Sequence, residues 1–183
     1  MGFDAGISIN KFKKDNSSKV DLFFLGRLNH SLDYLIYSHC SGKPETIEYG
    51  EPILPKKGPA IVQGYEIKTM SNKDGYEYTF TLKDVEAILA FVAPVHKICY
   101  KYSDRVLDEL ENYIDGYGDK PSEVSDEDIS KLKDALYTIA DDGDVDYPEL
   151  HKTLRVYSVF KALEELDQEF FDEFGPLIYW RSW

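Results

Sequence analysis

The sequence has little cysteine and no long apolar run. Only Cys40 and Cys99 occur among its 183 residues, too few for the disulfide framework of a small secreted protein. The longest nearly uncharged apolar stretch, 87–95, has about half the length that a membrane-spanning helix requires. Residues 1–10 also lack the basic region and apolar run of a secretory signal. We therefore expect the chain to act in the cytoplasm.

The sequence also lacks the short motifs that accompany common enzyme chemistries. It contains no glycine-rich phosphate loop, no G-x-S-x-G nucleophile motif and no His-rich metal motif. With 34 carboxylates in the chain, proximity of two of them says almost nothing about acid–base catalysis. We favour a non-catalytic protein without a cofactor. A small enzyme is the alternative, because many active sites leave no local motif.

The first half of the chain has the pattern of a small sheet. Apolar and polar residues alternate over 3–10, and an apolar run follows at 20–25. This predicts two hairpin-paired strands joined by a polar turn at 11–19. Apolar residues at steps of three and four predict a short helix over 31–40.

A segment rich in proline and glycine follows the short helix. Its composition predicts a long loop over 41–59, because proline and glycine interrupt both helices and strands. Two strands are expected at 60–70 and 76–82, joined by a turn over 71–75 that contains Asn, Asp and Gly.

The second half has helical patterns. Thr81 and Asp84 form a capping pair that opens a long helix, expected to end near 115–118 with a kink or break at 91–94 because of Pro94. Its apolar seam comprises Val85, Ile88, Val92, Val95, Cys99, Tyr102, Val106 and Tyr113.

Two further helices are predicted after this seam. Ser125 caps the first, which carries an apolar stripe up to Ile139. The second is expected to begin at Asp146 and to continue until Gly175 and Pro176 end it. We thus predict one α+β domain over 1–183, in which a small, mainly antiparallel sheet from the N-terminal half packs against a helical C-terminal half. Its parts are 1–82, mainly β with one short helix; 83–174, helical; and 175–183, a last strand or an aromatic tail.

Negative charge is in excess and unevenly distributed. Residues 1–82 carry 10 basic and 10 acidic side chains, whereas 83–183 carry 11 basic and 24 acidic ones, which accounts for the whole net charge of −13. Residues 104–149 alone hold 16 acids and four bases. This asymmetry disfavours direct nucleic-acid binding and favours attraction to a basic protein surface.

The acids at the start of this region recur at steps of three and four residues. On a helix they would line one exposed face opposite the apolar seam. The residues predicted to bind a partner are Asp104, Asp108, Glu111, Asp115, Glu123, Asp126, Glu127, Asp141, Asp142 and Asp144.

Two weaker patterns could hold a metal. Asp142, Asp144 and Asp146 alternate like the start of an EF-hand loop, but Tyr147 replaces the required glycine and Thr153 the bidentate glutamate. We therefore predict a solvated turn between two helices.

A pair of His-Cys groups supports the enzyme or ligand-binding alternative. His39 and Cys40, together with His96 and Cys99, could supply four zinc ligands or a Cys–His nucleophile. However, adjacent residues on a helix point in different directions, and Cys99 lies on the apolar seam, where a free cysteine is commonly a small apolar residue.

The end of the chain is aromatic. We favour its folding back onto the sheet as core, and the alternative is an interface formed by Tyr179, Trp180 and Trp183. The long seam and this aromatic end together lead us to expect a homodimer.

In size and charge the chain resembles small acidic inhibitors encoded by phages and mobile elements. Some of these, of the anti-CRISPR or anti-restriction type, occupy the nucleic-acid-binding groove of a host enzyme by mimicking phosphate charge. The resemblance covers composition and no motif. It implies a viral or mobile-element protein that binds a basic surface.

Overall fold

The chain forms a four-stranded antiparallel sheet that is covered by helices. The computed structural model describes residues 3–12, 15–41, 61–62, 65–66, 76–140 and 148–182. The sheet has the strand order β2-β1-β6-β5. Its strands are β1 (Phe3–Phe12), β2 (Asp15–Leu28), β5 (Tyr76–Phe80) and β6 (Leu177–Ser182). Two short strands, β3 (Ile61–Val62) and β4 (Tyr65–Glu66), pair with each other.

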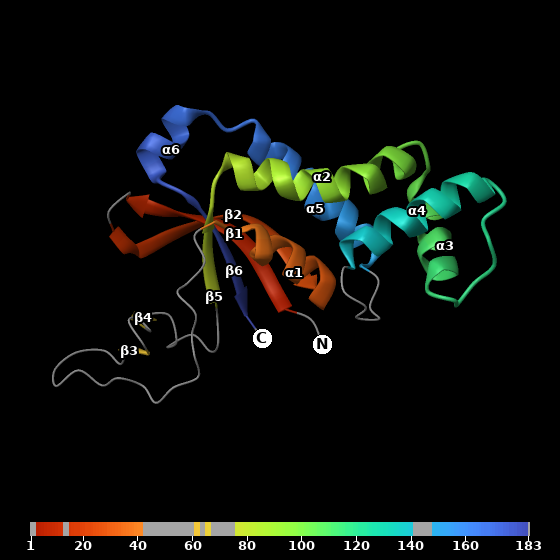
Figure 1. Ribbon diagram of the computed structural model, residues 1–183, viewed down its shortest axis with the longest axis horizontal. Helices are drawn as coiled ribbons and strands as arrows, with labels where there is room; N and C mark the ends of the chain where they lie inside the picture. The colour runs from red at the N-terminus through yellow and green to blue at the C-terminus, as the bar shows by residue number, and fades with distance from the viewer. Residues whose placement is uncertain are drawn as a thin grey trace.

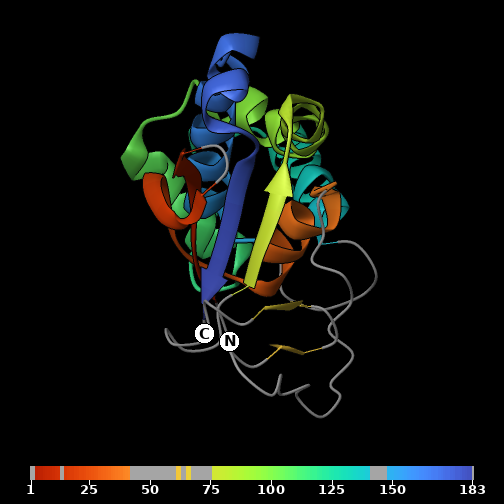
Figure 2. The same cartoon turned by 90° about the vertical axis from the view of Figure 1, so that its left-hand side faces the viewer.

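Six helices complete the described part of the chain. In Figure 2, β5 and β6 lie in front and the helices behind them. The helices are α1 (His30–His39), α2 (Leu82–Cys99), α3 (Asp104–Ile114), α4 (Asp126–Ile139), α5 (Leu150–Glu164) and α6 (Gln168–Phe174). The predicted α+β class is confirmed, since most of the sheet comes from the N-terminal half and most helices from the C-terminal half.

The core lies between the inner face of the sheet and α1, α2 and α5. Ile7, Phe80 and Tyr179 come from three strands and are fully buried. Phe80 stacks on Phe160 of α5, with ring centres 5.9 Å apart. The predicted seam is confirmed for its first part, because Val85, Ile88, Val92, Val95 and Cys99 of α2 are all buried.

The opposite face of the sheet depends on one close contact. Trp180 lies across Gly6 of the central strand β1 and stacks on Phe24 of β2, with ring centres 6.1 Å apart. A Cβ atom at Gly6 would lie 2.6 Å from the Trp180 ring and 2.8 Å from the carbonyl oxygen of Phe23. Only glycine therefore fits under Trp180.

Two side chains of α5 bind backbone carbonyls in the C-terminal half of the edge strand β2. Arg155 donates a hydrogen bond to the carbonyl oxygen of Phe24 at 2.8 Å, and the ammonium group of Lys152 donates to that of Arg27. Edge strands with free carbonyls tend to pair with other chains, so these two contacts protect part of this strand.

The helix boundaries differ from the prediction in two places. Of the kink or break predicted at 91–94, the break does not occur, since α2 is continuous through Pro94. Pro94 is exposed, and Val92 and Val95 beside it pack into the core. The chain breaks instead after Cys99, where Ser103 caps α3 by accepting the backbone N–H of Val106 at 3.4 Å.

The last predicted helix is in fact two helices. It begins at Leu150 rather than at Asp146, which lies outside the described residues, and it ends at Glu164. Asp167 then accepts the backbone N–H of Phe170 at 3.0 Å, and this local cap starts α6.

The sheet also differs in detail from the prediction. The polar turn expected at 11–19 is too long, because β1 continues to Phe12 and β2 begins at Asp15. β5 pairs with β6 in register Tyr78 to Tyr179, and with no other strand among the described residues. Apart from Ser41, the loop predicted at 41–59 lies outside the described residues, as does most of the strand predicted at 60–70.

Candidate partner-binding surface

Residues 104–140, which we call the acidic arm, comprise α3, α4 and the connection between them. They hold 11 acidic and four basic side chains. Both helices begin at a serine cap, and Ser125 accepts the backbone N–H of Asp128 at 3.1 Å. Acids occupy the first turn of each helix, where the helix dipole stabilises negative charge. Local sequence thus accounts for both helices.

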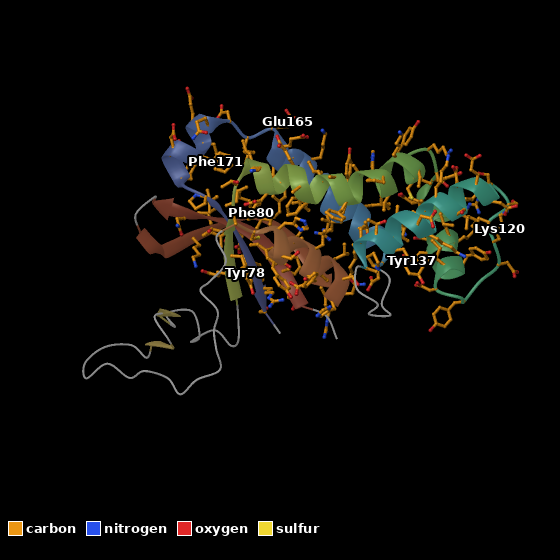
Figure 3. All side chains as sticks on the ribbon, in the orientation of Figure 1. Tyr78, Phe80, Lys120, Tyr137, Glu165 and Phe171 are labelled. Atoms are coloured by element: carbon orange, nitrogen blue, oxygen red, sulfur yellow. The ribbon has the colours of Figure 1, made fainter. Side chains whose placement is uncertain are left out.

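The acidic arm forms one end of the molecule. In Figure 1, α3 and α4 lie at the right, and the β1–β2 hairpin and α6 at the left. In Figure 3, Tyr137 marks the C-terminal part of α4, and Lys120 marks the connection that precedes this helix. The inner sides of both helices are buried through Val106, Leu107, Leu110, Ile129, Leu132 and Leu136. This packing gives the arm a fixed position on the core.

Every basic side chain of the arm is engaged by a group of the same arm. Arg105 forms ion pairs with Glu109 and Glu123, each at 2.5 Å. Lys120 pairs with Asp126, and Lys131 pairs with Glu127 at 2.6 Å. The ammonium group of Lys133 lies 5.3 Å from the centre of the Tyr113 ring. The excess of seven carboxylates therefore has no counterion within the arm.

Ion pairs alter the acidity of two carboxyl groups in the arm. Hydrogen bonds from Arg105 lower the pKa of Glu123. The pKa of Asp128 is lowered by Lys101, at 2.7 Å, and by the hydroxyl of Tyr102. Asp128 therefore stays charged and ties the first turn of α4 to the turn between α2 and α3.

The predicted acidic face of α3 is only partly exposed. Asp108 lies 2.6 Å from Nε2 of His151, and Glu111 accepts the backbone N–H of His151 at 3.4 Å. Only 22% of the Glu111 side chain is exposed. The expectation of a free face opposite the seam is therefore wrong for Glu111, because the N-terminus of α5 packs against this side of α3.

The other predicted partner-binding residues that the structure describes are on the surface. Asp104, Asp115, Glu123, Asp126 and Glu127 are exposed, and for Asp126 and Glu127 the exposed fractions are 92% and 74%. Asp141, Asp142 and Asp144, which include two residues of the EF-hand-like pattern, lie outside the described residues.

Asp115 is held in an unfavourable environment. Although Asp115 is an exposed residue, partial desolvation of its carboxyl group and the nearby carboxylate of Glu149 raise its pKa above the usual value of 3.8. The charged form is therefore disfavoured in the folded protein relative to the unfolded chain. This cost exists while Asp115 is ionised and disappears as the pH falls below its pKa.

Replacing Asp115 with Asn should stabilise the protein at neutral pH, by up to about 0.5 kcal/mol. The gain should vanish near pH 3, where the aspartate of the parent is protonated and no longer carries the cost. Urea unfolding of both proteins at the two pH values would measure it. Asp119→Asn, an exposed acid of the same arm, is the control. A gain that is equal at both pH values would contradict the explanation.

The aromatic end of the chain is part of the sheet. Tyr179 is fully buried, so the favoured expectation of a core role is confirmed for this residue. Trp180 is partly buried and donates a hydrogen bond to Asp21 at 3.2 Å, while its stacking partner Phe24 is 53% exposed. Trp183 lies outside the described residues. The interface role of Trp180 and the homodimer stay predictions.

The residues of the enzyme alternative have structural contacts. Nδ1 of His39 hydrogen-bonds the carbonyl oxygen of Leu35 at 2.7 Å, and buried Cys40 donates to that of Ile36 at 3.3 Å. Burial raises the pKa of Cys99 to about 12, so its thiol is not ionised at neutral pH. Among the described residues, no group of three or more His, Cys, Asp or Glu side chains is placed to hold a metal.

One buried polar cluster escaped the sequence analysis. Asp33 of α1 is fully buried, accepts the hydroxyl of Tyr179 at 2.7 Å and forms an ion pair with Arg181. The guanidinium carbon of Arg181 lies 4.3 Å from the centre of the Tyr37 ring. Burial raises the pKa of Asp33, whereas Tyr179 and Arg181 oppose this shift. Asp33 and Arg181 are 148 residues apart, so no local sequence pattern predicts their contact.

Within the part of the chain that the structure describes, no helix is both long and apolar enough to cross a membrane. Comparisons of the chain with models of protein families, with curated proteins and with solved structures return no match.

Proposed function

We propose that the chain is a non-catalytic binding module whose acidic arm occupies a basic, nucleic-acid-binding surface of another protein. Such a module would act as an inhibitor, of the kind that phages and mobile elements use against host enzymes. Its target would be a nucleic-acid-processing enzyme, and the nucleic acid itself would not be bound, since like charges repel each other.

The proposal rests on the excess of negative charge in the arm, whose basic side chains are already engaged by groups of the arm. Arg105, Lys120 and Lys131 are each paired with acids of the arm. Seven negative charges are therefore in excess over residues 104–140. A partner that brings cations to this surface would relieve the repulsion between the remaining carboxylates.

The rigidity of the arm supports mimicry of phosphates. Carboxylates four residues apart on a helix are separated by about 6 Å along its axis. Adjacent phosphates of a duplex strand lie at roughly this distance, because each step combines a rise of about 3.4 Å along the axis with a rotation around it. Because both helices pack on the core through their apolar sides, ordering these charges costs little entropy on binding.

The proposed place of action is the cytoplasm. The thiols of Cys40 and Cys99 are buried and form no disulfide with each other, as is usual in a reducing compartment. The enzymes that such an inhibitor would target work on nucleic acid in the same compartment.

A capture experiment with competition tests the proposal. The immobilised protein is incubated with a bacterial lysate that has been freed of nucleic acid, at low ionic strength. The column is then washed with excess double-stranded oligonucleotide, or with the same mass of an uncharged polymer as control. We expect the oligonucleotide to release a basic protein that the polymer leaves bound, because the two polyanions compete for one groove.

The released protein should also bind the oligonucleotide when it is alone. Adding the acidic protein should inhibit that binding. If captured proteins stay on the column in the presence of the oligonucleotide, or if none of them binds nucleic acid, the charge-mimicry proposal is wrong.

A further inference from the structure

Tyr117, in the connection between α3 and α4, is the most exposed of the large apolar side chains that the structure describes. Its exposed fraction is 87%, compared with 68% for Tyr100 and 64% for Tyr137. It stands between two exposed acids, Asp115 and Asp119. Tyrosine is enriched in protein interfaces, where it serves as a large anchor with few rotatable bonds.

The backbone of Tyr117 is fixed although its side chain is free of the core. Its N–H donates to the carbonyl oxygen of Asn112 at 2.8 Å, and the N–H of Gly116 donates to that of Tyr113 at 3.1 Å. With a φ of +83° at Gly116, this is a Schellman motif that ends α3.

In Schellman motifs the residue at the position of Tyr117 frequently packs against an apolar residue of the helix. Here the residue that it would meet is the polar Asn112, and the ring projects into solvent instead. A fixed backbone with an exposed ring is a preorganised anchor, because little freedom remains to be lost on binding.

We propose that Tyr117 receives an arginine side chain of the basic partner, whose guanidinium group stacks on the ring and pairs with Asp115 or Asp119. This inference rests on the proposed function and names the partner group that the arm recognises. A planar guanidinium can stack and donate to a carboxylate at once, whereas the compact, strongly hydrated ammonium of lysine is less suited to do both.

The protein contains the same combination in its own core. The guanidinium of Arg181 lies over the Tyr37 ring while it pairs with Asp33. In the connection between α3 and α4, the ring and the carboxylates are present and exposed, and the guanidinium would come from the partner.

Two peptides of equal charge, octa-arginine and octa-lysine, serve as probes. Each carries a fluorophore, and its binding to the full chain is measured by fluorescence anisotropy at low ionic strength. We expect octa-arginine to bind more tightly. Tyr117→Ala should weaken octa-arginine binding by about fivefold and octa-lysine binding by less than about twofold. Tyr117→Phe, which keeps the ring, should bind like the parent.

Tyr137→Ala is the matched control, since it removes an exposed tyrosine from α4 of the same arm and should leave octa-arginine binding within about twofold. If Tyr117→Ala binds octa-arginine as tightly as the parent, the anchor role is wrong. A triple variant, Asp126→Lys, Glu127→Lys and Asp134→Lys, separates this failure from that of the proposed function. If the triple variant binds both peptides as tightly as the parent, the acidic arm does not bind cations, and the proposed function is wrong.

Discussion

Replacing Arg181 with methionine should lower the free energy of unfolding by about 3 kcal/mol. Methionine fills similar space but leaves the carboxylate of Asp33, which is fully buried, without its cation. The remaining hydrogen bond from the Tyr179 hydroxyl cannot replace the lost charge. Urea unfolding at neutral pH, followed by circular dichroism, measures the difference.

A second variant separates the charge from the packing. Combining Arg181→Met with Asp33→Asn removes the buried charge but keeps an oxygen that accepts the hydroxyl of Tyr179. This double variant should recover most of the lost stability. Arg155→Met, which removes an exposed arginine with one hydrogen bond to the backbone, is the control and should cost about 1 kcal/mol or less. Equal losses in the single and double variants would show that Arg181 acts through packing alone.

The loss caused by Arg181→Met should depend on pH in a defined direction. Arg181 lowers the pKa of Asp33, so its removal lets burial raise that pKa further. Above the raised pKa the carboxylate is charged, and the full cost is present. As the pH falls through it, the carboxyl takes up a proton and the cost is lost. The difference in the free energy of unfolding between Arg181→Met and the parent should therefore become smaller as the pH is lowered from about 7 towards 4.

Reversing three charges on α4 should weaken binding of the captured partner by about 100-fold at low salt. The triple variant Asp126→Lys, Glu127→Lys and Asp134→Lys changes residues that lie within one side of the helix and are exposed. Most of the loss should appear in the association rate, because exposed charges steer encounter more than they hold the complex. Surface plasmon resonance at several salt concentrations measures both rates.

A matched control changes the net charge equally outside the acidic arm. Glu164→Lys, Glu165→Lys and Glu169→Lys also replace three exposed acids, and Glu165 lies well away from Lys120 in Figure 3. This control should bind within about threefold of the parent. Equal losses in both triple variants would mean that net charge matters and the arm does not. Circular dichroism must show a folded arm, because lysines in the first turn of α4 oppose its helix dipole.

The contacts of Asp108 and Glu111 determine this choice of residues. Reversing either of them would place a cation beside His151 at the start of α5. Such a variant would change the packing of α3 on α5 together with the surface charge. Substitutions on α4 test the surface charge without this ambiguity, since Asp126 and Glu127 form ion pairs with the exposed lysines Lys120 and Lys131.

Much of the local structure could be predicted because it depends on neighbours in the sequence. The spacing of apolar residues at steps of three and four correctly predicted the buried side of α2, and Ser125 caps α4 as expected. The alternation over 3–10 identified β1, and the apolar run at 20–25 identified its hairpin partner. The excess of acids over 104–149 likewise follows from composition alone.

Contacts between distant residues could not be predicted in the same way. β6 inserts between β1 and β5, and such pairing leaves no local pattern. Pro94 stays within α2 because the valines beside it are buried, which is a property of the packed core. The rigid exposure of Tyr117 also depends on a turn geometry that a Gly-Tyr-Gly sequence permits without requiring it.

The sequence by itself thus determined the α+β class, the positions of most helices and strands, and the location of the negative charge. Periodicity, capping and composition act over a few residues, so they can be read without a structure. The tertiary structure determined which acids remain exposed, that Asp33 pairs with Arg181, and that Tyr179 is buried in the core. These outcomes depend on which surfaces meet in space, and burial then sets the electrostatic cost of each buried charge.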